Sequence, residues 1–357
     1  MEIPKTEGIK YAGSKLKLLP FIFEMVSGLN GIETVLDGFS GSTRVSQAFA
    51  QLGYTTTSND ISVWSEVFAT CYLKSEKPNA FYKEIIDNLN NLIGVDGWYT
   101  ENYGGAENEI KKPFQLKNTR KLDAIREEIE RLNLLWEDKC VLLTSLIYAL
   151  DKVDNTLGHY VAYLSKWSPR SYNDLQLKLP HRFNTEKKHH VIRDDVFNTV
   201  KNNRFDLVYF DPPYGSNNEK MPPSRVRYAA YYHLWTTIIN NDKPQLFGKA
   251  NRREDSRDDC NGSVFEEFRK NESGDFLAME AMRKLINETN SRYLLLSYSS
   301  GGRATKEQLL ETISDSGKLL EIKLIDFQKN VMSNMRSTND WINSDGKHIE
   351  YLFLMEK

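Results

Sequence analysis

The chain has little cysteine and no long apolar run. Its 357 residues include only Cys71, Cys140 and Cys260, an odd number without a CxxC pair, which argues against disulfides and a structural zinc site. The longest apolar stretch, residues 141–150, is much shorter than the roughly 20 residues that span a bilayer. Residues 1–10 lack the apolar core of a secretory signal. We expect a cytoplasmic protein without membrane contact, and we expect no metal.

The chain also lacks an excess of charge of either sign. Its 47 basic and 49 acidic residues give a net charge of −2, which neither supports nor excludes binding to nucleic acid. The balance changes locally, because residues 165–190 hold six Lys or Arg side chains against two acidic ones. That run is either a positive binding surface or an ordinary solvated face, and the sequence leaves both open.

What the sequence does contain is an alternation of short strand-like runs with helical patterns. This alternation is typical of an α/β fold, and we expect a Rossmann-like mixed sheet of about seven strands. The expected strands are residues 33–37, 54–59, 190–193, 205–210, 293–299, 319–327 and 350–355. A chain of this length predicts about two domains.

The domain boundaries follow from two long interruptions of the alternation. Residues 60–189 separate the second and third strands, too many for one crossover, and they contain helical patterns. We expect a catalytic domain of residues 1–70 and 190–357 with an inserted, mainly helical domain at residues 71–189. Residues 215–275 hold three prolines and a mixed-charge run, which predicts a long loop near the active site, with some helix around residues 228–239.

A glycine turn joins the first strand to a helix in Val35–Phe49, VLDGFSGSTRVSQAF. Glycines allow the backbone to approach a ligand, and amides at the start of a helix favour a negatively charged group. Ser42 and Thr43 are candidate helix caps. The turn has neither the GxGxxG of dinucleotide sites nor the GKS or GKT of a phosphate loop. It predicts a nucleotide-type pocket or, taken alone, a structural turn.

Two further sites lie at strand ends. Asp60 ends the second strand, where nucleotide-binding sheets place a carboxylate on the ribose, although such an aspartate can also be a cap. The strand 205–210 leads into Asp211-Pro212-Pro213-Tyr214. The two prolines fix the backbone, so that the Asp211 carboxylate and the Pro212 carbonyl form two rigid acceptors for an NH₂ group. Tyr214 offers a flat face on which a base can stack.

These motifs resemble those of the Dam-type adenine-specific DNA methyltransferases, which use S-adenosylmethionine. The family's DPPY is similar to residues 211–214, its glycine loop to DGFSGS at 37–42, and its opening motif to YAGSK at 11–15, in the family's order. LLLSYS at 294–299 and EYLFL at 350–354 look like its fifth and last strands. The resemblance implies a fold like that of class I methyltransferases.

The resemblance also implies roles for individual residues. The catalytic residues would be Asp211, Pro212, Pro213 and Tyr214. The cofactor would be bound by Tyr11, Gly13 and Lys15 near its methionine end, by Asp37, Phe39, Gly41 and Ser42 in its pocket, by Asp60 at the ribose and by Asp195 at the adenine ring. Asp194 competes with Asp195 for that last role, and the choice stays open.

The family's target-recognition region corresponds to residues 71–189. Its DNA-facing loop is similar to residues 158–164 and to the basic, aromatic segment 166–182, and the loop after DPPY is a second candidate surface. The implied DNA contacts are Tyr163, Lys166, Arg170, Lys178, Arg182, Arg225 and Arg227. Tyr228, Tyr231 and Tyr232 belong to the same interleaved pattern of aromatic and basic side chains. Such side chains either stack on bases and contact phosphates or pack between helices.

The expected function is methyl transfer from S-adenosylmethionine to the N6 amino group of adenine in duplex DNA, by base flipping, within a restriction–modification system. Cytosine N4 methylation, or methylation of RNA or a protein amide, can use a tetrad similar to Asp211-Pro212-Pro213-Tyr214. A nicotinamide-dependent oxidoreductase shares the glycine turn but leaves DPPY unexplained, and a catalytically silent DNA-binding protein would not need the intact tetrad. The sequence leaves the oligomeric state open, a monomer included, and does not indicate the recognition sequence.

Overall fold

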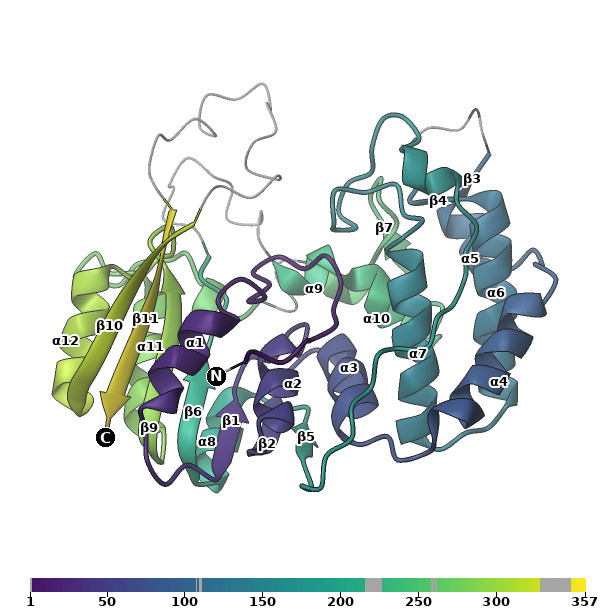
Figure 1. Cartoon of the computed structure of the whole chain (residues 1–357). Helices are drawn as coiled ribbons and strands as arrows, with labels where there is room; N and C mark the ends of the chain where they lie inside the picture. Colours follow the sequence, from purple (N-terminus) through teal and green to yellow (C-terminus); the bar gives the residue numbers. More distant parts are fainter. Residues whose placement is uncertain are drawn as a thin grey trace.

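The computed structural model describes residues 2–106, 108, 111–215, 227–257, 260, 262–327 and 348–357. A seven-stranded sheet lies at its centre, in the order β10-β11-β9-β6-β1-β2-β5 (Figure 1). The strands are β1 (Thr34–Asp37), β2 (Thr55–Asn59), β5 (His190–Ile192), β6 (Phe205–Phe210), β9 (Ser291–Ser299), β10 (Lys318–Phe327) and β11 (His348–Glu356). Each overlaps one of the seven strands expected from the sequence.

The sheet is mixed. The strands from β9 to β5 run parallel, whereas β11 is antiparallel to both of its neighbours, β9 and β10. This arrangement is consistent with the class I methyltransferase fold and confirms the expected mixed α/β sheet. Because β1 and β6 are parallel and adjacent, their carboxyl ends lie at the same edge of the sheet, where open α/β folds bind ligands.

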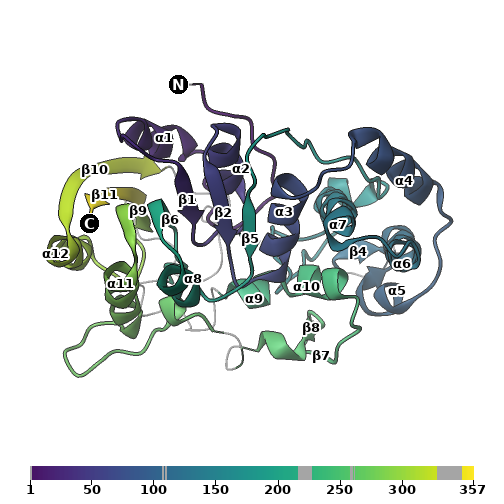
Figure 2. The same ribbon diagram turned by 90° about the horizontal axis from the view of Figure 1, so that it is seen from below.

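Helices cover both faces of the sheet (Figure 2). Alternate strand residues point to opposite faces, so Val35 and Leu207 pack in one core while Leu36 and Val208 pack in the other. The first core is closed by α1 (Leu19–Ser27) and α2 (Arg44–Gln51). The second is closed by α8 (Val196–Asn202), α11 (Leu277–Glu288) and α12 (Lys306–Ser316).

The chain between β2 and β5 is mainly helical and lies beyond the β5 edge of the sheet (Figure 1). Its elements are α3 (Val63–Leu73), α4 (Asn79–Asn91), α5 (Trp98–Tyr103), β3 (Gly104–Gly105), β4 (Phe114–Gln115), α6 (Leu116–Arg131), α7 (Trp136–Leu150) and the 3₁₀ helix η1 (Pro169–Tyr172). Helix α3 runs through the boundary expected between residues 70 and 71. Its Val67 packs in one core with Leu143 of α7.

The segment after β6 joins this helical region. It contains α9 (Tyr228–Tyr231), α10 (His233–Asn240), β7 (Leu246–Phe247), β8 (Arg252–Arg253) and the 3₁₀ helices η3 (Glu254–Ser256) and η4 (Val264–Glu266). Trp235 and Ile238 of α10 are buried in the core that holds α3 and α7. Arg126 of α6 is fully buried and donates to the backbone carbonyls of Ile238 and Ile239 at 2.5 and 2.9 Å, which satisfies carbonyls that the helix end leaves unpaired.

Among the helices of the described residues, none is long and apolar enough to span a membrane.

Candidate active site

The candidate site is built on the carboxyl ends of β1 and β6. Asp37 is the last residue of β1, Asp211 directly follows β6, and the register places Asp37 opposite Tyr209. Both carboxylates line one pocket of about 300 Å³, which includes space open to solvent. The lining residues are Tyr11, Gly13, Lys15, Asp37, Phe39, Ser40, Gly41, Ser42, Arg44, Val45, Tyr209 and Asp211. The structure thus brings together seven of the nine residues expected to bind a cofactor.

The glycine turn has its shape because side chains are close on both sides. A Cβ at Gly38 would lie 2.6 Å from the Phe210 ring, and one at Gly41, where φ is +48°, would lie 2.9 Å from the Tyr11 ring. Gly41 also donates its amide to Asp60 Oδ2 at 2.9 Å. A larger residue at Gly38 or Gly41 would therefore displace the Phe210 ring or the Tyr11 ring.

Asp37 is the more deeply buried of the two carboxylates that line the pocket. Ser46 Oγ donates to its Oδ2 at 2.6 Å, while Oδ1 has no hydrogen-bond partner among the described residues. Burial raises the pKa of Asp37 to about 7, although the Ser46 hydrogen bond opposes the shift. A ligand group with an N–H or a positive charge is the natural partner of the free oxygen.

The expected side-chain cap of α2 is not formed. Thr43 is the N-cap residue, with φ at 62°, but no side-chain oxygen caps the helix. The Thr43 hydroxyl instead accepts a hydrogen bond from Gln47 Nε2 at 3.0 Å. The helix start therefore presents backbone amides beside Ser42, which lines the pocket.

Asp60 and Asp195, the other two expected cofactor residues, lie outside the residues that line the pocket. Asp60 binds the chain itself: besides the Gly41 amide it accepts from Ser62 N at 2.9 Å and Ser62 Oγ at 2.7 Å. Asp195 is exposed and caps α8 by accepting from Phe197 N at 2.9 Å. Asp194 Oδ1 accepts from Asp195 N and from Asn198. Their contacts with a cofactor stay predictions.

The tetrad carries a compact polar network. Lys15 Nζ lies 2.8 Å from Asp211 Oδ2 and 5.0 Å from the centre of the Tyr214 ring. The Tyr214 hydroxyl donates to Asp211 Oδ1. Burial raises the pKa of Asp211, and the Lys15 ammonium limits the rise. Both oxygens of the carboxylate are thus engaged, one by a cation and one by a phenol.

The N-terminal segment is held over the pocket by aromatic side chains from the chain after β6. The Tyr11 ring stacks on Tyr232 with centroids 4.8 Å apart. Ala12 donates its amide to the Tyr232 hydroxyl at 2.7 Å and accepts from the Tyr228 hydroxyl at 3.1 Å. Tyr232 also stacks on Trp235 at 4.1 Å and is fully buried. Of the two roles left open by the sequence, Tyr232 has the packing role.

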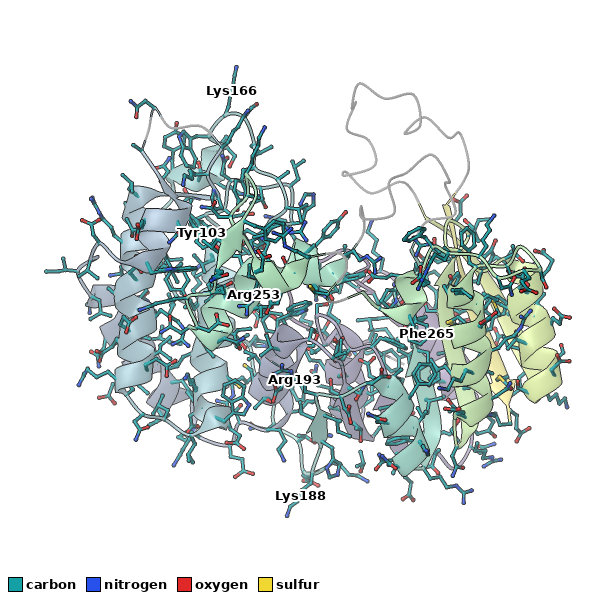
Figure 3. The ribbon with its side chains drawn as sticks, turned by 180° about the vertical axis from the view of Figure 1, so that it is seen from behind. Tyr103, Lys166, Lys188, Arg193, Arg253 and Phe265 are labelled. Carbon is teal, nitrogen blue, oxygen red and sulfur yellow. The ribbon has the colours of Figure 1, made fainter. Side chains whose placement is uncertain are left out.

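The residues expected to face DNA differ in their exposure and in their contacts with the rest of the chain. Lys166 is exposed at the end of the helical region opposite to Lys188 (Figure 3). Tyr163 Oη donates to the backbone carbonyl of Ala250, which links its loop to the β7–β8 hairpin. Lys178 is exposed. Arg225 lies outside the described residues.

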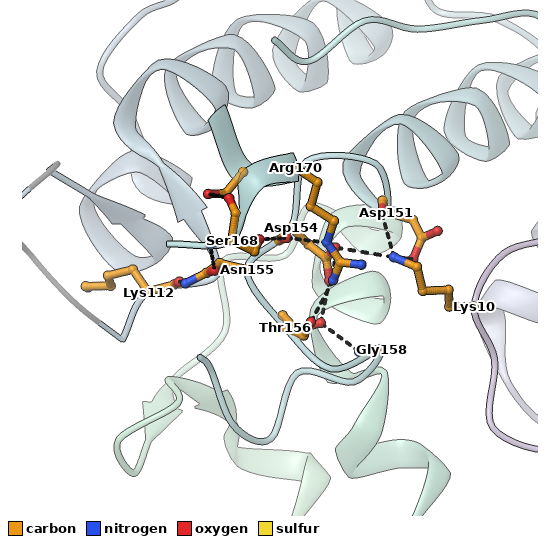
Figure 4. Close-up of polar contacts among 10 residues, drawn as sticks. Lys10, Lys112, Asp151, Asp154, Asn155, Thr156, Gly158, Ser168 and Arg170 are labelled. Atoms are coloured by element: carbon orange, nitrogen blue, oxygen red, sulfur yellow. Dashed lines mark hydrogen bonds and ion pairs between the residues drawn. The ribbon is translucent and has the colours of Figure 1, made fainter. Parts of the chain in front are cut away.

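Two of the expected DNA-facing arginines have protein partners, and a third is buried. Arg170 donates to the carbonyls of Asp154 and Thr156 at 2.8 and 2.6 Å and pairs with Asp154 Oδ1 at 2.7 Å (Figure 4). Arg182 binds Ser75, Lys77 and Asn79, beyond the end of α3. Arg227 is buried. Burial raises the pKa of Glu266 to about 7, and the charge of Arg227 limits the rise. Their contacts with DNA stay predictions.

Comparison with known proteins identifies the family. A family model described as D12 class N6 adenine-specific DNA methyltransferase matches residues 11–290, more than three quarters of the chain. The chain belongs to this family. The match runs through the opening motif, the glycine turn and the tetrad, and it confirms the expected adenine-specific methyltransferase class. A nicotinamide-dependent oxidoreductase is therefore not supported.

Curated relatives of the D12 family member agree. The chain is 33% identical to the modification methylase StsI of Streptococcus sanguinis, over 93% of the chain and 50% of the relative. It is 26% identical to the type II methyltransferase M.NlaIII of Neisseria lactamica, over 98% of the chain and 99% of the relative. It is also 26% identical to M.FokI of Planomicrobium okeanokoites, over 87% of the chain and 47% of the relative. The chain thus spans about half the length of two of these relatives and nearly all of the third.

Proposed function

We propose that this chain transfers a methyl group from S-adenosylmethionine to the N6 amino group of adenine in duplex DNA, as a modification enzyme. The observation that carries the proposal is the shared pocket of Asp37 and Asp211. In this proposal Asp37 binds the cofactor and Asp211 binds the amino group, and both lie at the carboxyl edge of the sheet. The description of the family supports adenine in DNA over the other amino substrates. The names of the relatives, a modification methylase and a type II methyltransferase, support methyl transfer by a modification enzyme.

The residues of the pocket fit the cofactor. Asp37 offers a buried oxygen without a partner among the described residues, and Gly41 allows the backbone to lie close to the Tyr11 ring, where a Cβ would not fit. The amides at the start of α2 and the Tyr11 ring complete a lining with donors, acceptors and a flat face. When bound, S-adenosylmethionine supplies a methyl group that its sulfonium makes electrophilic.

The tetrad acts on the target amine. The lone pair of an aromatic amine is delocalised into its ring, so the amine is a poor nucleophile. Hydrogen bonds to Asp211 and to the Pro212 carbonyl favour the pyramidal, more nucleophilic form and the positive charge that develops on nitrogen. Lys15 favours the ionised form of Asp211 by opposing the pKa rise that burial causes. Tyr214 stacks on the flipped base in place of its lost neighbours.

We further propose that residues 71–189 form the target-recognition domain and that the segment 215–275 contributes to the DNA surface. Lys166 is exposed at one end of the helical region, and the β7–β8 hairpin is tied to the same loop through Tyr163 and Ala250. A DNA duplex on this surface would contact loops from both segments.

The decisive experiment is the identification of the product. The chain is incubated with S-adenosylmethionine labelled in its methyl group and with duplex DNA of diverse sequence, and the nucleosides are separated by mass spectrometry. We expect label in N6-methyladenine and none in the reaction of Asp211→Ala. Label in N4-methylcytosine, or label transferred to RNA or protein but not to DNA, would contradict the proposal.

A further inference from the structure

A second carboxyl group reaches the tetrad from a strand to which the sequence assigns no function. Glu350 lies on β11, opposite Ser299 of β9 in the sheet register. Its Oε2 is 3.3 Å from the Tyr214 hydroxyl oxygen. Burial raises the pKa of Glu350, and the nearby Asp211 carboxylate adds to the rise, whereas Lys15 opposes it. The antiparallel last strand therefore extends the network that begins at Lys15.

The Tyr214 hydroxyl lies between two carboxyl groups. It donates to Asp211 Oδ1, and Glu350 Oε2 and Ser297 Oγ lie within 3.3 and 3.2 Å of it. A phenol carries a single proton and donates to one acceptor at a time. The same proton can turn from Asp211 to Glu350 while the ring stays in place, because rotation about the C–O bond is sufficient.

Asp211 has to release one partner before it can bind a substrate amine along the same direction. Its Oδ2 is held by Lys15, an ion pair between two largely buried groups, so the Tyr214 hydroxyl at Oδ1 is the partner that is easier to replace. A buried donor that loses its acceptor is costly unless a second acceptor is in reach. Glu350 is such an acceptor.

We propose that Glu350 is a positioning residue: it accepts the Tyr214 hydroxyl when the target amino group replaces that hydroxyl at Asp211. This inference rests on the proposed function and adds to it a residue that acts through Tyr214 and does not itself touch the substrate. The exchange leaves every covalent bond intact and moves no proton between molecules. It frees one oxygen of Asp211 and keeps the Tyr214 ring oriented for stacking.

A double-mutant cycle tests the role. Glu350→Leu should lower kcat/KM for DNA about threefold to tenfold, the effect of one hydrogen bond, and leave the Kd of S-adenosylmethionine unchanged. Glu350→Gln should restore most of the activity, because its amide oxygen accepts the same hydroxyl. On a Tyr214→Phe background, Glu350→Leu should change kcat/KM less than twofold, since no hydroxyl remains to be accepted.

Controls separate this role from a structural one. Glu356→Leu removes a carboxylate from the same strand, where it pairs with Arg292, and should leave kcat/KM unchanged. Glu350→Ser, which is too short to reach Tyr214, replaces Glu350→Leu in the cycle if the leucine variant does not fold. Equal losses on the wild-type and Tyr214→Phe backgrounds, or no loss at all, would overturn the role of Glu350. A wild-type chain that methylates no DNA would instead overturn the proposed function.

Discussion

The Lys15 ammonium lies 2.8 Å from Oδ2 of Asp211, and the two side chains are 7% and 15% exposed. The pair joins the N-terminal motif to the tetrad, nearly 200 residues later in the chain. Burial disfavours the ionised form of Asp211, whereas Lys15 favours it. The charge state of the Asp211 carboxylate therefore depends on a residue of the N-terminal motif.

This dependence predicts a shifted pH profile for Lys15→Met. Without the ammonium, the pKa of Asp211 should rise further, because burial is then less opposed. In the proposed mechanism activity requires the ionised carboxylate, so the acidic limb of the kcat/KM profile should move to higher pH. The profile is measured from pH 5 to 9, with Lys17→Met as the matched control. A Lys15→Met profile that falls uniformly without moving would assign Lys15 another role.

Asp37 predicts a second pH dependence, in cofactor binding. Its pKa is about 7 in the free protein, so below pH 7 the group is mainly protonated. A positively charged ligand favours the carboxylate, so binding at pH 6 should release a proton, and affinity should increase as the pH rises to about 7 and then level off. Calorimetry of S-adenosylmethionine binding in buffers of different ionisation enthalpy measures the release.

Two variants test whether Asp37 is the responsible group. Asp37→Asn should bind more weakly and without proton release. Ser46→Ala removes the hydrogen bond that lowers the pKa of Asp37, so its affinity should level off at a higher pH than that of the wild type. The same dependence in wild type and Asp37→Asn would point to a different titrating group.

Lys166 and Lys188 offer a matched pair for the DNA surface. Both are exposed, and they lie on opposite sides of the molecule, at the top and the bottom of Figure 3. If Lys166 contacts a phosphate, Lys166→Glu should reduce the slope of log K against log salt by about 0.9 in magnitude, and Lys188→Glu should leave it unchanged. Fluorescence anisotropy at several salt concentrations gives the slopes. Equal effects would indicate a general charge effect instead of a contact.

The fold was predictable to a large extent because its signals are local. The strands around Val35 and Val208 are short apolar runs bounded by turn residues. The motif residues also meet at one sheet edge, since carboxyl ends of parallel strands lie together. No local pattern marks Glu350, because its contact with Tyr214 depends on the register between β9 and β11.

The partners of the charged side chains could not be predicted from the sequence either. Arg170 and Arg182 are basic residues in a basic segment, but the structure gives them carbonyl and carboxylate partners on the chain. Tyr232 is of a residue type that can stack on bases, but in the structure it is fully buried like a core residue. Such assignments depend on packing between segments far apart in the sequence, which periodicity does not encode. The unformed cap at Thr43 likewise depends on a backbone conformation.

The last prediction concerns Tyr214 and separates its ring from its hydroxyl. If the ring stacks on a flipped adenine, Tyr214→Ala should lose about 1–3 kcal/mol of target binding. Tyr214→Phe keeps the ring and should retain much of the activity, since it also removes the hydroxyl that occupies Asp211 Oδ1. The two variants should therefore diverge.

A mismatched target base tests the flipping step directly. Flipping costs less when the base is already unpaired, so a mismatch at the target should partly restore the activity of Tyr214→Ala and change that of Tyr214→Phe little. The fluorescence of 2-aminopurine at the target should rise on binding to the wild type and rise less with Tyr214→Ala. Equal rates and equal fluorescence for all three folded proteins would remove Tyr214 from the mechanism, and Asp211 and the Pro212 carbonyl would then hold the base alone.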